Sequence, residues 1–222
     1  MAGIVPVKMR FVSAAVVFAF GALAAAAAQA SVFVDAKDDI FLAGLSSPPI
    51  FPPSQTQTAE PGNGAGLLPV AVSVFGGETL HLTATGLADC GVGCNPAGSG
   101  PAGDPEFGTA SIEAYGNVGS YTGSPGEGFQ LLGAYNVGTT WTPFIIGSGG
   151  TFVVPTGATT LYLGLPDGFS FQGPPGAYND NTGGFTVSGV GVPEPATWAM
   201  MLVGFAGLGA AMRSQRKQAA AA

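Results

Sequence analysis

The sequence predicts an all-β protein, a β-sandwich, and three observations point to this fold class. Val, Thr, Phe and Tyr are frequent and fall in short runs, as in strands. The 37 glycines and 18 prolines interrupt the chain often, without the three-residue period of collagen. Residues 31–190 contain no stretch with the spacing of an amphipathic helix. Many short strands joined by turns are typical of two packed sheets.

The first 30 residues predict a secretory signal peptide with a signal helix. Lys8 and Arg10 precede a long apolar run, and Ala28-Gln29-Ala30 places small residues where signal peptidase reads them. We expect cleavage before Ser31. The alternative is a second membrane helix, and the alanine-rich end with its small-residue cleavage site argues against it.

Residues 31–67 predict edge strands followed by a linker. Val32-Phe33-Val34 and Ile40-Phe41-Leu42 are short apolar pieces, which we interpret as one or two edge strands. Residues 45–67 are rich in Pro, Ser, Thr, Gly and Gln and show no apolar period, so they predict a loop or linker.

Residues 68–190 predict the sandwich itself. Two alternating runs, 69–75 and 78–85, flank Gly76-Gly77, which is a two-residue hairpin signal. In the second run Leu80, Leu82 and Ala84 share one face, and His81 points to solvent on the other. Further strands are expected at 107–115, 128–137, 142–146, 151–155, 159–165 and 184–188.

The charge of the predicted mature chain is strongly acidic. Between Ser31 and Val192 one lysine stands against seven aspartates and five glutamates, a formal net charge of −11. Nucleic acid is excluded as a natural partner, because phosphate binding needs clustered Lys and Arg. A hard cation such as Ca2+ fits this charge.

Cys90 and Cys94 are the only cysteines, and two thiols alone do not make a structural zinc site. In an oxidising compartment they predict a disulfide that closes a short glycine-containing loop.

The loop 165–184 is the most informative one for chemistry. Asp167, Asp180 and Asn181 bring carboxylate and amide oxygens to it, and Ca2+ takes six to eight such oxygens. The alternative is a plain turn, because Asn and Asp also favour turns.

This loop resembles the C-terminal calcium loop of the bacterial galactophilic lectins. The likeness rests on Asp167 followed by Pro-Gly-Ala-Tyr-Asn-Asp-Asn-Thr-Gly-Gly-Phe-Thr-Val, and residues 100–106 resemble a second loop of that family. The likeness covers roughly Leu68 to Ser188 and implies that the sandwich is a lectin-like β-sandwich. It implies a calcium site. Its side-chain ligands would be Asp167, Asp180 and Asn181, and its backbone carbonyls would come from Ala177 and Cys90.

The resemblance also implies a sugar site, at Asp167, Asp180, Asn181 and Phe107. Phe107 stands where the lectins have a sugar-contacting histidine, and about five extra residues, 168–172, enlarge the calcium loop. Calcium binding therefore transfers better than galactose binding. Phe169 and Phe171 are either stacking residues for a sugar or core residues.

The sequence carries none of the common hydrolase or phosphate-binding motifs, so we do not expect an enzyme. Asp104 and Glu106 could imitate a catalytic carboxylate pair, but in an exposed Gly-Pro loop we expect both to be solvated.

The last thirty residues predict a transmembrane helix, 196–212, with a basic end. No charged side chain falls within it, and its 17 residues span roughly 25 Å at about 1.5 Å per residue, slightly short of a hydrocarbon core. Pro195 fixes the helix start and Trp198 suits the lipid interface. A buried core helix is the alternative.

Residues 192–217 resemble the PEP-CTERM sorting signal of exopolysaccharide-producing bacteria, through Pro193-Glu194-Pro195, the apolar segment and the Arg-rich end. The resemblance implies an exosortase as partner, a transient inner-membrane anchor, and then the cell surface or extracellular matrix. We therefore expect an exported protein that binds extracellular polysaccharide with Ca2+. The alternative is a structural matrix protein without a small ligand.

Overall fold

The computed structural model describes residues 30–50, 63–91, 98–104, 109–123 and 128–190, and residues 201–209, 212–213 and 216 of the C-terminal segment. Several predictions fall on residues outside these ranges. They are the secretory signal up to residue 29, Cys94, Glu106, Phe107 and the sorting motif Pro193-Glu194-Pro195.

The described body is built from short strands, as predicted. They are β1 (Ser31–Asp35), β2 (Val70–Ser73), β3 (Thr79–Asp89), β4 (Ser111–Ile112), β5 (Tyr121–Thr122), β6 (Leu132–Tyr135), β7 (Phe144–Ile145), β8 (Gly149–Val153), β9 (Thr160–Gly164), β10 (Gln172–Gly173) and β11 (Thr182–Ser188). Two 3-10 turns, η1 (Ile40–Leu42) and η3 (Phe169–Phe171), complete the elements.

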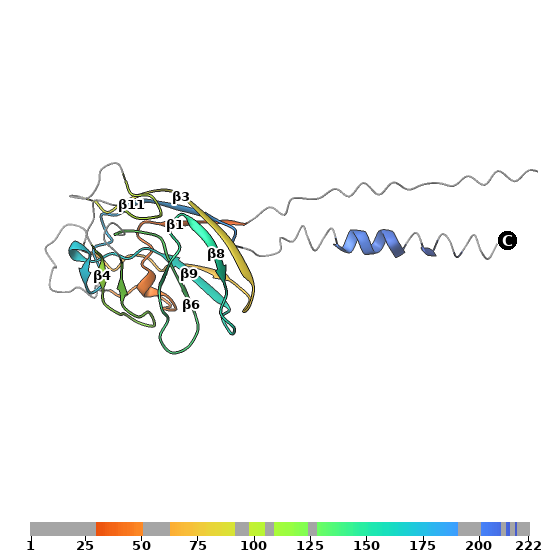
Figure 1. Ribbon diagram of the computed structural model, residues 1–222, viewed down its shortest axis with the longest axis horizontal. Coiled ribbons are helices and arrows are strands. Elements are labelled where there is room, and N and C mark those ends of the chain that lie inside the picture. Colours follow the sequence, from red (N-terminus) through yellow and green to blue (C-terminus); the bar gives the residue numbers. More distant parts are fainter. Residues whose placement is uncertain are drawn as a thin grey trace, which may run out of the picture.

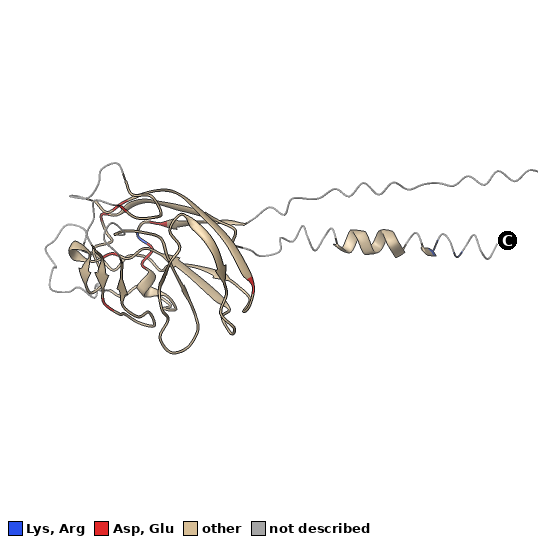
Figure 2. Cartoon of the chain, in the orientation of Figure 1, with Lys and Arg blue, Asp and Glu red and all other residues tan. Residues whose placement is uncertain are grey.

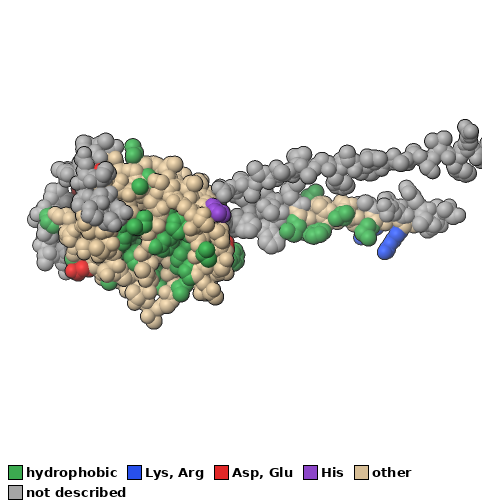
Figure 3. Space-filling view, viewed as in Figure 1, with side chains coloured by type: hydrophobic (Ala, Val, Ile, Leu, Met, Phe, Trp, Pro, Cys, Tyr) green, Lys and Arg blue, Asp and Glu red, His purple; other side chains and the backbone are tan. Residues whose placement is uncertain are grey.

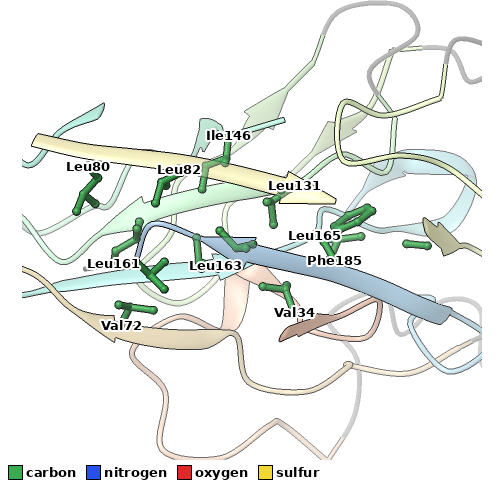
Figure 4. Close-up of a cluster of buried hydrophobic side chains, with 14 of the residues drawn as sticks. Val34, Val72, Leu80, Leu82, Leu131, Ile146, Leu161, Leu163, Leu165 and Phe185 are labelled. Carbon is green, nitrogen blue, oxygen red and sulfur yellow. The ribbon is translucent and has the colours of Figure 1, made fainter. Parts of the chain in front are cut away.

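Two four-stranded antiparallel sheets form the sandwich (Figure 1). The first sheet has the order β1-β11-β3-β8, and the second has the order β2-β9-β6-β7. Alternate residues of both sheets meet in the main core, which Figure 4 shows around Leu82, Leu161 and Phe185. Phe185 and Leu161 are completely buried and Leu82 is nearly so, because only one face of each strand can turn inward.

A further layer covers the outer face of the second sheet. Leu132 and Ala134 of β6 pack there against Ile40 and Phe41 of η1 and against Ile112 of β4. The small sheet with the order β10-β4-β5 belongs to this layer. The segment that follows β1 is thereby part of the folded body, and it brings Asp39 beneath the loop 165–184.

The predicted hairpin at Gly76-Gly77 is wrong, although the turn itself forms. The backbone N–H of Glu78 donates to the carbonyl of Phe75 at 3.1 Å. However, β2 pairs with β9, whereas β3 pairs with β11 and β8. Each strand buries its apolar face against the opposite sheet, so the turn is a corner between the two layers.

Of the one or two edge strands predicted before residue 45, one is present as β1, whereas Ile40-Phe41-Leu42 form η1. The Asp39 side chain accepts from the backbone N–H of Phe41 at 2.8 Å and caps this turn. A local carboxylate–backbone bond of this kind competes with strand pairing. The predicted strands at 142–146, 151–155, 159–165 and 184–188 are present as β7, β8, β9 and β11 with shifted limits.

Residues 201–209 of the predicted transmembrane helix are helical, and their side chains are exposed. Across the described parts of the chain, we find no helix that combines the length and the apolar character needed to cross a membrane. Residues 196–200 and 210–211 of the predicted span lie outside the described residues.

A buried acidic network beneath the loop 165–184

Tyr178 is the centre of a buried polar network in the loop before β11. Its hydroxyl lies 3.0 Å from Oδ1 of Asp39 and 2.9 Å from the carbonyl of Leu165, and it accepts from the backbone N–H of Asp167 at 2.8 Å. The Tyr178 and Asp39 side chains are completely buried. A buried tyrosine hydroxyl needs polar partners, and this one ties the loop to the segment of η1.

Asp167 and Asn181, which lie near the two ends of the loop, contact each other directly. The Asn181 Nδ2 group donates to Asp167 Oδ2 at 2.8 Å and to the carbonyl of Ala36 at 3.1 Å. Asp167 Oδ1 accepts from the backbone N–H of Gly168 at 2.7 Å. Both oxygens of Asp167 are therefore hydrogen-bonded.

Two oxygens of this network have no partner. Asp39 Oδ2 and Asn181 Oδ1 are buried and make no hydrogen bond, although both side chains are completely excluded from solvent. A buried acceptor without a donor costs about 1–3 kcal/mol, so such atoms are rare in folded proteins. An oxygen of this kind is suited to accept a cation, which supplies the missing positive charge.

Asp180 lies beside the residue that follows Cys90, and Ala177 belongs to the same loop as Asp180. A Cβ on Gly91 would collide with the Asp180 carboxylate, so this side chain lies against the residue after Cys90. Pairing of β11 with β3, with Thr182 opposite Asp89, holds this contact in register. Ala177 has a left-handed backbone, φ 67°, and follows Gly176, whose N–H donates to the Asp167 carbonyl at 3.1 Å.

The acidic groups of the network are held towards their protonated forms. Burial raises the pKa of the Asp39 carboxyl to about 8, against hydrogen bonds from Phe41 and Tyr178 that lower it. Burial also raises the pKa of Asp167 well above its usual range, and the nearby carboxylates of Asp180 and Asp39 add to this. Asp39 and Asp167 are thus two buried acids that lie near each other without a compensating positive charge.

The five predicted metal ligands fit a mixed oxygen site better than a carboxylate cage. We find no cluster of three or more His, Cys, Asp or Glu side chains arranged for a metal within the described residues. Asp167, Asp180 and Asn181 would instead be joined by carbonyl oxygens, which Ca2+ also accepts. The unpartnered Asn181 Oδ1 is the observation that favours a cation here.

The predicted sugar contacts are less favourable. Asn181 is completely buried and Asp167 is only 3% exposed, so neither offers a free surface atom to a sugar. Phe169 is 40% exposed, whereas Phe171 packs edge-on against Phe129 with ring centroids 6.2 Å apart. Phe107 lies outside the described residues and remains a prediction.

Two further predictions concern Asp104 and the cysteines. The prediction that Asp104 is solvated is wrong, because its side chain is 2% exposed and accepts from the Ser99 hydroxyl at 3.2 Å. The backbone N–H of Asp104 also donates to the Gly128 carbonyl at 3.2 Å, which joins this turn to a distant segment. Cys90 is disulfide-bonded. Its pairing with Cys94 remains a prediction, since Cys94 lies outside the described residues.

Asp39 and Tyr178 are members of the network that the sequence did not indicate as functional. Tyr178 stands within the loop that resembles the lectins, but its hydroxyl partners come from distant parts of the chain. Asp39, directly before an apolar triplet, has the pattern of a helix N-cap. That signal predicts the cap to Phe41 but not the contact with Tyr178, 139 residues away.

Fold and site together define an acidic all-β sandwich with a buried carboxylate network at the loop before its last strand. Residues 191–217 match the family model described as the PEP-CTERM protein-sorting motif. No curated protein and no solved structure matches the chain. The comparisons thus do not support the resemblance to the galactophilic lectins.

The sorting motif confirms the prediction made from Pro193-Glu194-Pro195 and the segment after it. This motif marks a protein for export and surface sorting and makes an exosortase its processing partner. The chain is therefore an exosortase substrate destined for the cell surface.

Proposed function

We propose that the exported protein is associated with extracellular polysaccharide and that its sandwich binds Ca2+ at the Asp167–Asn181 loop. The observation that carries the metal proposal is the buried, unpartnered Asn181 Oδ1 beside Asp167. A cation there would satisfy this oxygen and balance the charge of Asp167, whose pKa burial otherwise raises. The ligands would be the side chains of Asp167, Asp180 and Asn181 and the carbonyls of Ala177 and Cys90.

The location supports this function. The sorting motif directs the chain to the cell surface, where Ca2+ and an extracellular polysaccharide would be within its reach. The apolar segment 196–212 would hold the chain at the inner membrane until the exosortase removes it, after signal peptidase has acted at the N-terminus. The exposed helical residues 201–209 suit such a temporary anchor.

The metal is tested by thermal unfolding of the exported protein with millimolar Ca2+ or in calcium-free buffer, together with calorimetric titration. At a hundred times the dissociation constant, Ca2+ stabilises the fold by about 2.7 kcal/mol. For a domain of this size that corresponds to a rise in Tm of roughly 5–10 °C. Asp180→Ala should remove most of this rise, because it deletes one of the proposed ligands. The variant should still fold, since Asp180 is only half-buried and its loss leaves the core intact.

Asp89→Ala is the matched control. Asp89 is also a half-buried acid near Gly91, where its carboxylate accepts from the Gly91 N–H at 3.1 Å, but it is outside the proposed ligand set. We expect this variant to keep the Ca2+-dependent rise. Identical melting curves with and without Ca2+ for the folded parent protein would refute the metal site.

A structural matrix protein is the second candidate. It is favoured by the hydrogen bonds that already engage both oxygens of Asp167. In that case the network would serve only to stabilise the loop. This reading becomes the better one if Ca2+ has no effect on stability and no polysaccharide is retained.

A further inference from the structure

We propose that the outer face of the first sheet binds an uncharged polysaccharide, independently of Ca2+. This inference rests on the proposed association with extracellular polysaccharide and moves the contact away from the buried loop. The observation behind it is an exposed row of hydroxyl groups with one aromatic ring across three neighbouring strands, β1, β11 and β3.

Strand register assembles this row. Phe33 of β1 lies opposite Thr186 of β11, which lies opposite Thr85 of β3. Ser31, Ser188 and Thr83 lie two residues away along the same strands and form a second row. We call these six residues the hydroxyl face.

All six side chains point away from the core. Their sequence neighbours Val34, Val187 and Ala84 are buried, so strand alternation turns the hydroxyl face to solvent. Neighbouring strands are about 4.8 Å apart and alternate residues about 6.7 Å apart. Hydroxyls at these spacings offer repeated donors and acceptors to a polymer with its own repeated hydroxyls.

Phe33 provides the apolar part of this surface. Its ring covers Gly184, where a Cβ would come within 2.7 Å of the ring edge, and the side chain is still 57% exposed. The ring therefore lies on the sheet instead of standing free in solvent. A sugar ring has an apolar C–H face that can stack on such a surface, while its hydroxyls reach the threonines.

The charge of the protein favours an uncharged polymer as the partner of this face. The hydroxyl face holds no Asp, Glu, Lys or Arg, although the predicted mature chain has a net charge of −11. Figure 2 shows how few charged residues the body carries, and in Figure 3 acidic side chains lie towards the margins of the visible face. An anionic polymer would be repelled by the protein as a whole, whereas an uncharged one meets no electrostatic cost.

Composition argues against a protein partner. Protein interfaces are enriched in aromatic residues and depleted in Ser, but five of the six residues of the hydroxyl face are Ser or Thr. A carbohydrate matches both features, because it is hydroxyl-rich at its edges and apolar on its ring faces.

The test is native gel electrophoresis of the exported protein through gels containing dextran, galactomannan or xyloglucan, with alginate as the anionic probe. We expect at least one neutral polymer to retard the protein equally with Ca2+ and in calcium-free buffer, and alginate to have no effect. Phe33→Ala should weaken the retardation about tenfold in dissociation constant, through loss of ring contact. Phe33→Trp should preserve it.

Phe75→Ala is the matched control, because Phe75 is a phenylalanine of similar exposure, 65%, at the corner between the two sheets. It should bind as the parent does. Thr186→Glu, which places a carboxylate in the middle of the hydroxyl face, should abolish retardation without lowering Tm by more than a few degrees.

Other outcomes overturn the inference separately from the metal site. Retardation that is lost in calcium-free buffer and unchanged in Phe33→Ala would place the sugar at the loop 165–184 instead. A parent protein that is dimeric by light scattering and becomes monomeric in Phe33→Ala would make the face a contact between copies of the chain. No retardation by any neutral polymer would refute polysaccharide binding, while the Ca2+ melting test would stand on its own.

Discussion

Asp39 should make the folded protein lose stability as the pH rises, in calcium-free buffer. Its ordinary pKa is 3.8, and burial raises the pKa to about 8 in the folded state. Between these values the folded state keeps a proton that the unfolded state has released. Stability from this group is therefore complete at low pH and is lost as pH rises towards 8, by about 1.4 kcal/mol per pH unit.

The structure shows which substitution isolates this effect. In Asp39→Asn the amide oxygen can still accept from Phe41 and from the Tyr178 hydroxyl, as Asp39 Oδ1 does. The amide nitrogen takes the place of Oδ2, which has no hydrogen-bond partner. The variant thus imitates the protonated acid and does not titrate.

The assay is the free energy of unfolding from urea titrations at pH 5, 6 and 7. At pH 5 the parent should already be less stable than Asp39→Asn by about 1.6 kcal/mol, because pH 5 lies above the ordinary pKa of 3.8. From pH 5 to 7 the parent should lose roughly 2.7 kcal/mol more than the variant, corresponding to a Tm difference of about 5–10 °C. Asp167 leaves a pH dependence of the same sign in both proteins, because its pKa is also raised.

Tyr178→Phe separates titration from hydrogen bonding. It removes the hydroxyl that accepts from the Asp167 backbone, so stability should fall by about 1–3 kcal/mol at each pH. Asp39 remains buried in this variant. Its stability should therefore still fall with pH more steeply than that of Asp39→Asn. Equal pH slopes for the parent and Asp39→Asn, with cooperative unfolding in both, would refute the assignment of a protonated Asp39.

The two other predictions concern processing and the cysteines. Intact mass of the protein released to the medium should show the loss of the residues beyond the Pro193-Glu194-Pro195 region, and a secreted population still ending at Ala222 would contradict exosortase processing. Non-reducing peptide mapping should find Cys90 joined to Cys94, and recovery of Cys94 as a free, alkylatable thiol would exclude this pairing.

Some of the predicted features depend only on local sequence, and the structure or the comparisons confirm them. The alternation in 78–85 correctly places Leu80 and Leu82 in the core and His81 on the exposed side. Gly76-Gly77 correctly predicts a turn. The sorting motif is contiguous in the chain, so it can be recognised without a fold.

Strand pairing could not be read in this way. A turn signal specifies the reversal of the chain, but the partners of β2 and β3 depend on which apolar faces meet across the sandwich. Similarly, Asp39 is completely buried beside Tyr178, a contact that the local sequence around Asp39 does not indicate. The free energy of a carboxylate depends on solvent and neighbours, which are properties of the assembled fold.

The sequence by itself determined the all-β fold class, the acidity and the sorting signal. It also indicated the loop that carries Asp167 and Asn181. Only the tertiary structure decided that Asn181 Oδ1 lacks a partner, that Asp39 joins the network, and that three strands combine their hydroxyls on one face. The physical reason is that periodicity, charge and short motifs act over neighbouring residues, whereas burial and strand register bring together residues more than a hundred positions apart.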